Sequence, residues 1–139
     1  MLTAVIALGI GSMKGKQLIL IVDDEQDITF VLEMMLNDRY DVDAYTDPVE
    51  ALANVKPHKY DLILFDYLMP KMNGFEFYHK VKQIDPIVNI CMMTAYEAIP
   101  AYQRGSDPVP PFDSKFILKK PFDLAQMLTK FNEIMNDKR

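Results

Sequence analysis

Three aspartates follow two apolar stretches that each have the length of a buried strand. Asp66 comes directly after residues 62–65, and Asp23 and Asp24 come directly after residues 18–22. If both stretches are parallel strands of one sheet, their carboxyl ends meet at one edge and the carboxylates converge there. Carboxylates at close quarters repel one another, and hard oxygen ligands suit a Mg²⁺ ion that keeps several waters. The sequence therefore predicts a divalent-metal site that contains a nucleophilic carboxylate.

Two further polar side chains follow later apolar stretches. Thr94 comes after residues 88–93, and Lys120 comes after residues 115–119. A lysine ammonium would neutralise charge on the oxygens of a transferring phosphoryl group, and a threonine hydroxyl would donate a hydrogen bond to one of them. With an ionised Asp66 as the nucleophile, these groups predict phosphoryl transfer to a carboxylate.

The elements that must position these side chains alternate between strands and helices. Strands are expected at residues 17–22, 40–45, 61–65, 88–93 and 115–119. Helices are expected at residues 27–37, from 48 to about 55, from 74 to about 84, and from near 123. This order predicts an α/β fold with parallel strands, right-handed crossovers and helices on both faces of the sheet. Ligands of such sheets bind beyond the carboxyl ends of the strands, where all five polar side chains are placed.

Local signals support several of these helices. Asp47 before Pro48 predicts a helix cap, and Asn73-Gly74 predicts the turn that opens the third helix. The buried face of the first helix is predicted to be Ile28, Val31, Leu32, Met35 and Leu36. That of the last helix is predicted to be Leu124, Met127, Leu128, Phe131, Ile134 and Met135. Between Thr94 and Lys120 the prolines Pro100, Pro108, Pro110 and Pro111 predict a fourth helix that is short, shifted or absent.

Composition narrows the class of protein. The chain has 139 residues, a net charge of -5 and a pI near 4.9, which argue for one domain and against a nucleic-acid binder. The single cysteine, Cys91, excludes an internal disulfide, fits a reducing compartment such as the cytoplasm, and is expected to be a buried side chain. His58 and His79 are too far apart to suggest a zinc site. Residues 1–12 are apolar but shorter than a membrane span, so residues 1–15 are expected to be an appendage of unknown role and residues 16–139 the domain.

Four segments, in order, resemble the receiver domains of two-component response regulators. They are Val22-Asp23-Asp24-Glu25, the Asp-Tyr-Leu-Met-Pro-Lys-Met-Asn-Gly segment at 66–74, Thr94-Ala95, and Lys120-Pro121-Phe122. Each lies at the end of an expected strand, and the resemblance runs from about residue 16 to 135. It implies a flavodoxin-like (βα)5 sandwich with five parallel strands in the order 2-1-3-4-5.

The resemblance also implies a metal site and a phosphoacceptor. Asp66 would accept the phosphoryl group, and the carboxylates of Asp24 and Asp66 would bind Mg²⁺, for which Mn²⁺ could substitute. Asp23 would act largely through coordinated water, and the backbone carbonyl of Leu68 would complete the protein ligands.

Two more residues take roles from the resemblance. Thr94 would be the switch hydroxyl and Lys120 the phosphate-binding cation, next to a cis Lys120–Pro121 bond. Lys119 competes for the second role, but neighbours in a strand point to opposite faces, and Lys120 directly precedes the proline. Ile117 stands where family members often carry an aromatic residue. The surface through which phosphorylation would be transmitted to a partner is therefore not predicted.

The expected function is that of a stand-alone receiver. It would accept a phosphoryl group from a histidine kinase or a phosphotransfer protein and then change its affinity for a downstream protein effector. It would catalyse only its own phosphorylation and dephosphorylation. Direct binding to nucleic acid or to a membrane is not expected, and a homodimer is compatible with the sequence.

Two alternatives come from other classes of protein. A phosphatase with an aspartyl nucleophile would want a second acid two residues after Asp66, where Leu68 stands. A scaffold that binds metal without being phosphorylated is the other alternative, and the proline-rich segment before Lys120 motivates it.

Overall fold

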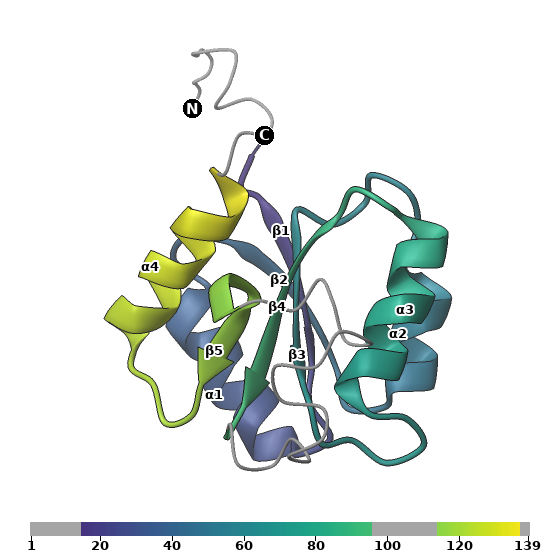
Figure 1. Ribbon diagram of the computed structural model, residues 1–139. Helices are drawn as coiled ribbons and strands as arrows, with labels where there is room; N and C mark the ends of the chain where they lie inside the picture. Colours follow the sequence, from purple (N-terminus) through teal and green to yellow (C-terminus); the bar gives the residue numbers. More distant parts are fainter. Residues whose placement is uncertain (1–14, 96–113, 137–139) are drawn as a thin grey trace.

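A parallel five-stranded sheet forms the centre of the protein in the computed structural model, which describes residues 15–95 and 114–136 (Figure 1). Its strands are β1 (Leu18–Val22), β2 (Asp41–Tyr45), β3 (Leu62–Asp66), β4 (Asn89–Thr94) and β5 (Ile117–Lys119). Neighbouring strands pair in parallel in the order β2-β1-β3-β4-β5. The predicted flavodoxin-like fold and its strand order are confirmed.

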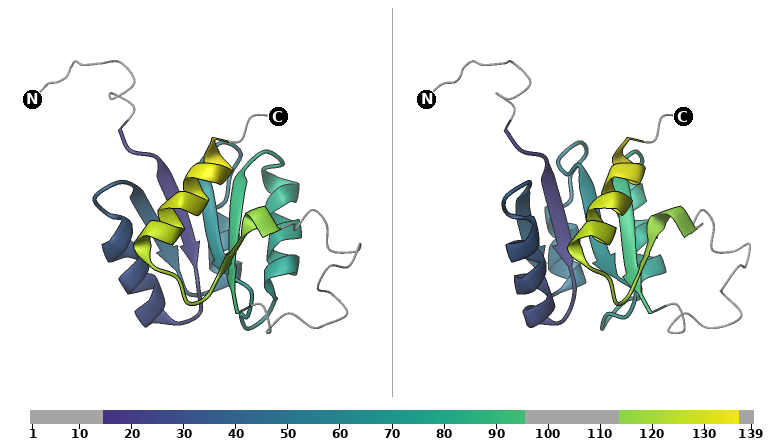
Figure 2. Two further views of the ribbon diagram at one scale, coloured as in Figure 1. Left: turned by 60° about the vertical axis from the view of Figure 1, so that its left-hand side comes forward. Right: turned by 90° about the vertical axis from the view of Figure 1, so that its left-hand side faces the viewer.

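Helices cover both faces of the sheet. They are α1 (Gln26–Leu36), α2 (Pro48–Asn54), α3 (Gly74–Ile84) and α4 (Leu124–Met135), and a 3-10 turn, η3 (Ser114–Phe116), precedes β5. Figures 1 and 2 show α2 and α3 on one face and α1 and α4 on the other. The predicted helices agree with the observed ones to within two residues at their starts. The predictions for an appendage at 1–15 and for the proline-rich fourth helix fall largely outside the described residues.

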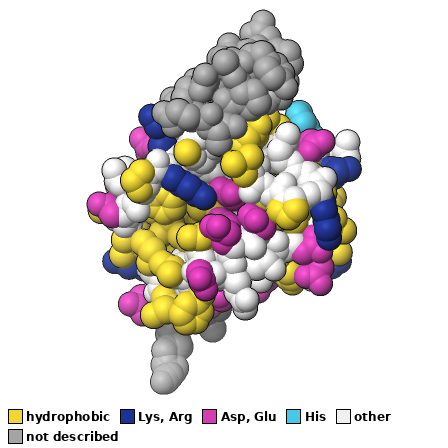
Figure 3. Space-filling model, turned by 90° about the horizontal axis from the view of Figure 1, so that it is seen from below, with side chains coloured by type: hydrophobic (Ala, Val, Ile, Leu, Met, Phe, Trp, Pro, Cys, Tyr) yellow, Lys and Arg dark blue, Asp and Glu magenta, His cyan; other side chains and the backbone are white. Residues whose placement is uncertain are grey.

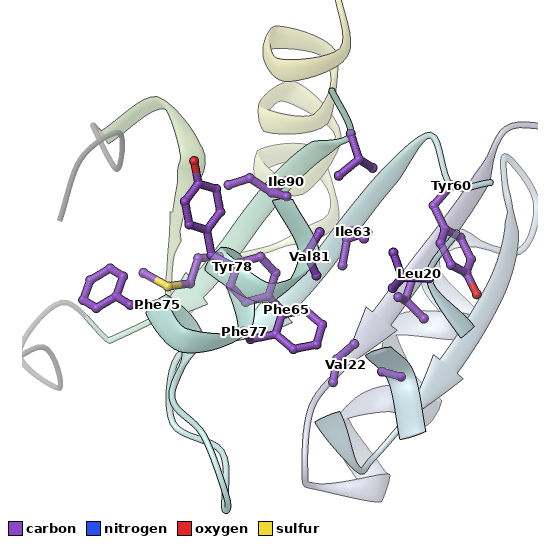
Figure 4. Close-up of a cluster of buried hydrophobic side chains, with 14 of the residues drawn as sticks. Leu20, Val22, Tyr60, Ile63, Phe65, Phe75, Phe77, Tyr78, Val81 and Ile90 are labelled. Atoms are coloured by element: carbon purple, nitrogen blue, oxygen red, sulfur yellow. The ribbon is translucent and has the colours of Figure 1, made fainter. Parts of the chain in front are cut away.

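Successive side chains of each strand point to opposite faces of the sheet and belong to two hydrophobic clusters, one on each face. Under α2 and α3, Leu20, Val22, Ile63 and Phe65 pack with side chains that include Phe77 and Val81 (Figure 4). Under α1 and α4, strand residues that include Ile19, Ile21, Leu62, Leu64 and Met93 pack with Leu36, Met127, Phe131 and Ile134. The central strands are thus packed against helices on both faces of the sheet, so their carboxyl ends are held in fixed positions.

Cys91 belongs to the second cluster and is fully buried, as predicted. Burial raises the pKa of its thiol to about 12, with a small opposing effect of Lys130. The side chain therefore serves packing.

Two details of the sequence-based prediction are wrong. Val31 was expected on the buried face of α1, but its side chain is exposed, and Thr29 is buried instead with its hydroxyl donating to the Gln26 carbonyl at 2.8 Å. Leu32 and Leu36 face the sheet, and Val31 lies about 100° around the helix from Leu32. The last strand starts at Ile117 and not at 115, because the preceding residues form η3.

Capping fixes the starts of three helices. Asp47 accepts a hydrogen bond from the Val49 N–H at the start of α2, as predicted. Asn73 and Asp123 each form a reciprocal capping box at the starts of α3 and α4. Within the described part of the chain, no helix has the length and apolarity that crossing a bilayer requires.

Candidate phosphoacceptor site

The carboxyl ends of β1 and β3 carry the acidic residues singled out in the sequence. Asp66 is the last residue of β3, and Asp23 and Asp24 directly follow β1. Val22, the last residue of β1, pairs with Phe65, so Asp66 and Asp23 each follow one residue beyond this pair. Figure 3 looks onto this end of the molecule, where acidic side chains gather near the centre beside a basic one. The strand register therefore brings together residues that are far apart in sequence.

The three carboxylates form one cluster. One oxygen each from Asp23, Asp24 and Asp66 lies within 4.8 Å of the other two. Asp23 and Asp66 are buried, with 1% and 7% of their surface exposed, whereas Asp24 is exposed. The cluster is therefore open to solvent on one side and enclosed on the other.

Lys120 brings a positive charge to this cluster from the end of β5. Its Nζ lies 2.7 Å from Oδ1 of Asp66 and 3.8 Å from Oδ2 of Asp23. The Lys120 N–H donates to the Thr94 carbonyl at 2.9 Å, and the Lys120–Pro121 bond is cis, as the resemblance implied. Lys120 is thus held against the nucleophile candidate by its backbone as well as by its charge.

Burial and charge act in opposite directions on the two buried carboxylates. Burial raises the pKa of Asp66, and the hydrogen bond from Lys120 counteracts it. Burial also raises the pKa of Asp23 to about 6; the Glu25 N–H, which donates to Oδ1 at 2.9 Å, opposes this rise, and repulsion by Asp66 adds to it. Both side chains are therefore harder to ionise than free aspartates unless more positive charge arrives.

The chemistry of this donor set fits a divalent cation. Three hard carboxylate oxygens within reach of one another suit Mg²⁺, which keeps its remaining positions for water. Oδ2 of Asp23 is buried and has no hydrogen-bond partner among the described residues. An unsatisfied buried carboxylate oxygen is costly, so a bound cation would supply the missing interaction.

Thr94 ends β4 next to this cluster. Its side chain is buried, and its hydroxyl donates to the carbonyl oxygen of Ala95 at 2.8 Å. Leu68 lies two residues beyond Asp66 in the loop between β3 and α3, and its side chain is 59% exposed. Its backbone carbonyl stays a predicted ligand.

The comparisons with known proteins agree with this geometry. The family model of the response regulator receiver domain matches residues 19–132. The chain belongs to this family. Response regulator ArlR of Staphylococcus aureus is 32% identical over 121 aligned residues, in a match that covers 84% of this chain and 52% of ArlR. The chain thus spans about half the length of the curated relatives of this kind that it matches.

Solved structures of receivers superpose on the chain. The chemotaxis response regulator CheY4 of Vibrio cholerae has a TM-score of 0.71 at 30% identity, covering 86% of this chain and 98% of that one. The receiver domain of sensor histidine kinase PA1611 from Pseudomonas aeruginosa has a TM-score of 0.73 at 25% identity, covering 88% of this chain and all of that one. The latter structure has a magnesium ion coordinated in its active site cleft.

Sequence reasoning missed two features of this receiver. A Cβ on Gly74 would lie 2.7 Å from Sδ of Met92 and 3.0 Å from Cα of Tyr67, so any side chain at the start of α3 would force its neighbours to shift. Lys71 Nζ lies 3.0 Å from Oδ2 of Asp47. The first feature has a signal in the Asn-Gly pair, but the second joins two loops that no sequence pattern connects.

Proposed function

We propose that this receiver is a phosphoacceptor in two-component signalling and that Asp66 accepts a phosphoryl group from the phosphohistidine of a histidine kinase or a phosphotransfer protein. The observation that carries the proposal is the 2.7 Å contact between Lys120 and Asp66 within the acidic cluster. A carboxylate that ends a rigid strand, with an ammonium on one oxygen, is placed for attack on an anionic phosphoryl group.

The metal of this proposal is Mg²⁺, with Mn²⁺ as a substitute. Asp24 and Asp66 would bind it through their carboxylates, Asp23 largely through water, and Leu68 through its backbone carbonyl. Bound Mg²⁺ would supply positive charge beside the phosphoryl oxygens. The acidic cluster and the buried oxygen of Asp23 that accepts no hydrogen bond from the described residues support this assignment.

The chemical step is an in-line displacement at phosphorus. An ionised oxygen of Asp66 forms the new bond to phosphorus while the bond from phosphorus to the imidazole nitrogen breaks. The electron pair stays on that nitrogen, and the product is an acyl phosphate. Lys120 neutralises negative charge on the phosphoryl oxygens as they arrive. Since Asp66 must be ionised to attack, Lys120 also favours the reactive form of the nucleophile.

Thr94 would respond to the new phosphoryl group. Its hydroxyl donates to Ala95 in the unphosphorylated protein, and it would donate to a phosphoryl oxygen after transfer. Ala95 directly follows β4, so this change of acceptor would act where the chain leaves the strand. We infer that the phosphorylated form differs from the unphosphorylated form in its affinity for a protein effector.

The receiver would catalyse only its own phosphorylation and dephosphorylation and would turn over no other substrate. We place it in the cytoplasm, with a kinase or phosphotransfer protein and a protein effector as its partners. A net charge of -5 disfavours direct contact with nucleic acid.

Phosphorylation by a small donor tests the assignment. We expect acetyl phosphate with Mg²⁺ to add one phosphoryl group to the wild type, detected by intact mass, and a chelator to abolish it. Asp66→Asn should stay unmodified, while Asp41→Asn, at the opposite edge of the sheet, should be modified normally. Equal modification of the wild type and Asp66→Asn would overturn the proposal.

A further inference from the structure

An ion pair joins the two loops on either side of β1. Lys71 lies in the loop between β3 and α3, and its Nζ is 3.0 Å from Oδ2 of Asp47, which follows β2. In the sheet, β1 lies between β2 and β3. The pair therefore connects the loops that flank the end of β1, directly after which Asp23 and Asp24 stand.

Asp47 provides a fixed anchor for this contact. Its Oδ1 accepts a hydrogen bond from the Val49 N–H at 2.9 Å and so caps α2, while Oδ2 pairs with Lys71. The hydrogen bond from Lys71, followed by that from Val49, lowers the pKa of Asp47. The carboxylate is thus ionised at neutral pH and held in place by the helix that it caps.

Lys71 adopts a backbone conformation that side chains rarely take. Its φ of 76° lies in the left-handed region, which is disfavoured for a residue with a Cβ atom. The loop around it is held at both ends, because the Tyr67 N–H donates to the Met93 carbonyl and the Gly74 N–H donates to the Tyr67 carbonyl. Leu68 lies between these ends, on the same stretch as Lys71.

We propose that Lys71 is a positioning residue whose ion pair with Asp47 holds this loop beside the acidic cluster and thereby sets the affinity of the site for a divalent cation. The contact would act through the backbone of the loop that carries the Leu68 carbonyl. The inference rests on the proposed function for the role of that carbonyl as a ligand. Lys71 itself would touch neither the cation nor the phosphoryl group.

Magnesium titrations of three variants test this role. Lys71→Met removes the positive charge of the ion pair. Asp47→Ser removes the negative charge but keeps a side chain that caps α2, and the third variant combines the two substitutions. We expect each to weaken Mg²⁺ binding by about two- to fivefold, the size of a surface ion pair's effect. Because the two residues act through one contact, the double variant should be no weaker than either single one.

The control is another lysine in an ion pair, far from the acidic cluster in the sequence. Lys130 pairs with Glu133 at 3.6 Å on α4, so Lys130→Met should leave the Mg²⁺ affinity unchanged. Amide hydrogen exchange of residues 68–73 in the metal-free protein gives a second readout, which should speed up in Lys71→Met and Asp47→Ser. It should not change in Lys130→Met.

The outcomes separate this inference from the proposed function. Wild-type affinity for Mg²⁺ in Lys71→Met, or additive losses in the double variant, would overturn the positioning role even if Asp66 is phosphorylated normally. Conversely, a wild type that binds Mg²⁺ but is not phosphorylated on Asp66 would overturn the proposed function and leave the positioning role intact.

Discussion

The Lys120 ammonium lies 2.7 Å from Oδ1 of Asp66 and 3.8 Å from Oδ2 of Asp23, so this one side chain forms ion pairs with two buried carboxylates. The third carboxylate of the cluster, Asp24, forms no ion pair with any of the described residues. If all three acids are ionised, three negative charges and one positive charge leave a net charge of -2. A divalent cation balances that remainder, which is the physical reason for a metal at this edge of the sheet.

Removal of the lysine charge should slow phosphorylation. We expect Lys120→Met to reduce the rate of phosphorylation by acetyl phosphate about a hundredfold, because it loses a charge beside the transferring group. It should also raise the pKa of Asp66 further, since the lysine opposes the effect of burial. The rate is measured at saturating Mg²⁺ by intact mass. Lys119→Met is the matched control, and an equal loss in both variants would contradict a specific role for Lys120.

Asp23 should make the stability of the metal-free protein depend on pH. Its pKa is about 6 in the folded state and 3.8 ordinarily, with burial as the largest cause. A raised pKa means that the folded state holds the proton more tightly than the unfolded chain. The resulting stabilisation is fully present below about pH 4 and is lost as the pH rises through about 6. The free energy of unfolding should fall in this window by on the order of 3 kcal/mol.

The variant Asp23→Asn isolates this effect. Chemical denaturation without Mg²⁺ should show the variant gaining stability relative to the wild type as the pH rises from about 4 to about 7. Added Mg²⁺ should stabilise the wild type more than the variant. Asp38→Asn, at an exposed position, serves as the control. A difference between wild type and Asp23→Asn that stays constant over this range would rule out the assigned cause.

Leu68 should prolong the life of the acyl phosphate. Its side chain is large, apolar and exposed two residues beyond Asp66, where it would hinder an attacking water molecule. We expect Leu68→Asn, which offers a polar group to orient water, to shorten the half-life of the phosphorylated protein severalfold. Leu68→Met keeps the apolar bulk and should decay like the wild type. A longer half-life in Leu68→Asn would show that the side chain does not shield the phosphoryl group.

Gly74 should be intolerant of even one added methyl group. In Gly74→Ala the new Cβ would lie 2.7 Å from Sδ of Met92 and 3.0 Å from Cα of Tyr67. We expect a loss of about 1–3 kcal/mol in the free energy of unfolding, the usual effect of overpacking. Better helix propensity offsets up to about 1 kcal/mol of it. In a double variant, Met92→Ala should relieve part of the loss; a fully additive double variant would exclude contact with Met92 as the cause.

The strands and most helices were predictable because their signals are local. The apolar runs that end in Asp23 and Asp66 mark buried strands, and Asp47 before Pro48 marks the start of α2. The exposed position of Val31 was not predictable, because an apolar stripe on a short helix allows more than one rotation against the sheet. Only packing against the second cluster shows that Leu32 and Leu36 face inward.

The candidate site was predictable in its members but not in its contacts. Strand ends in a parallel sheet meet at one edge, which suffices to place Asp23, Asp24 and Asp66 together. The distances to Lys120 depend on the path of the chain after β5, which the sequence does not specify. The Lys71–Asp47 contact depends on the conformation of two loops and on a left-handed backbone at a lysine, for which no residue pattern gave a signal.

The hydroxyl of Thr94 has a single proton, and the Ala95 carbonyl already accepts it at 2.8 Å. A phosphoryl oxygen would have to compete with that carbonyl, so one hydrogen bond is lost for each one gained. Because a hydrogen bond to an ionised phosphoryl oxygen is stronger than one to a neutral carbonyl by on the order of 1 kcal/mol, the exchange would favour the new arrangement of this part of the chain by a small margin only. A partner with even a modest preference for one of them could then shift the population substantially.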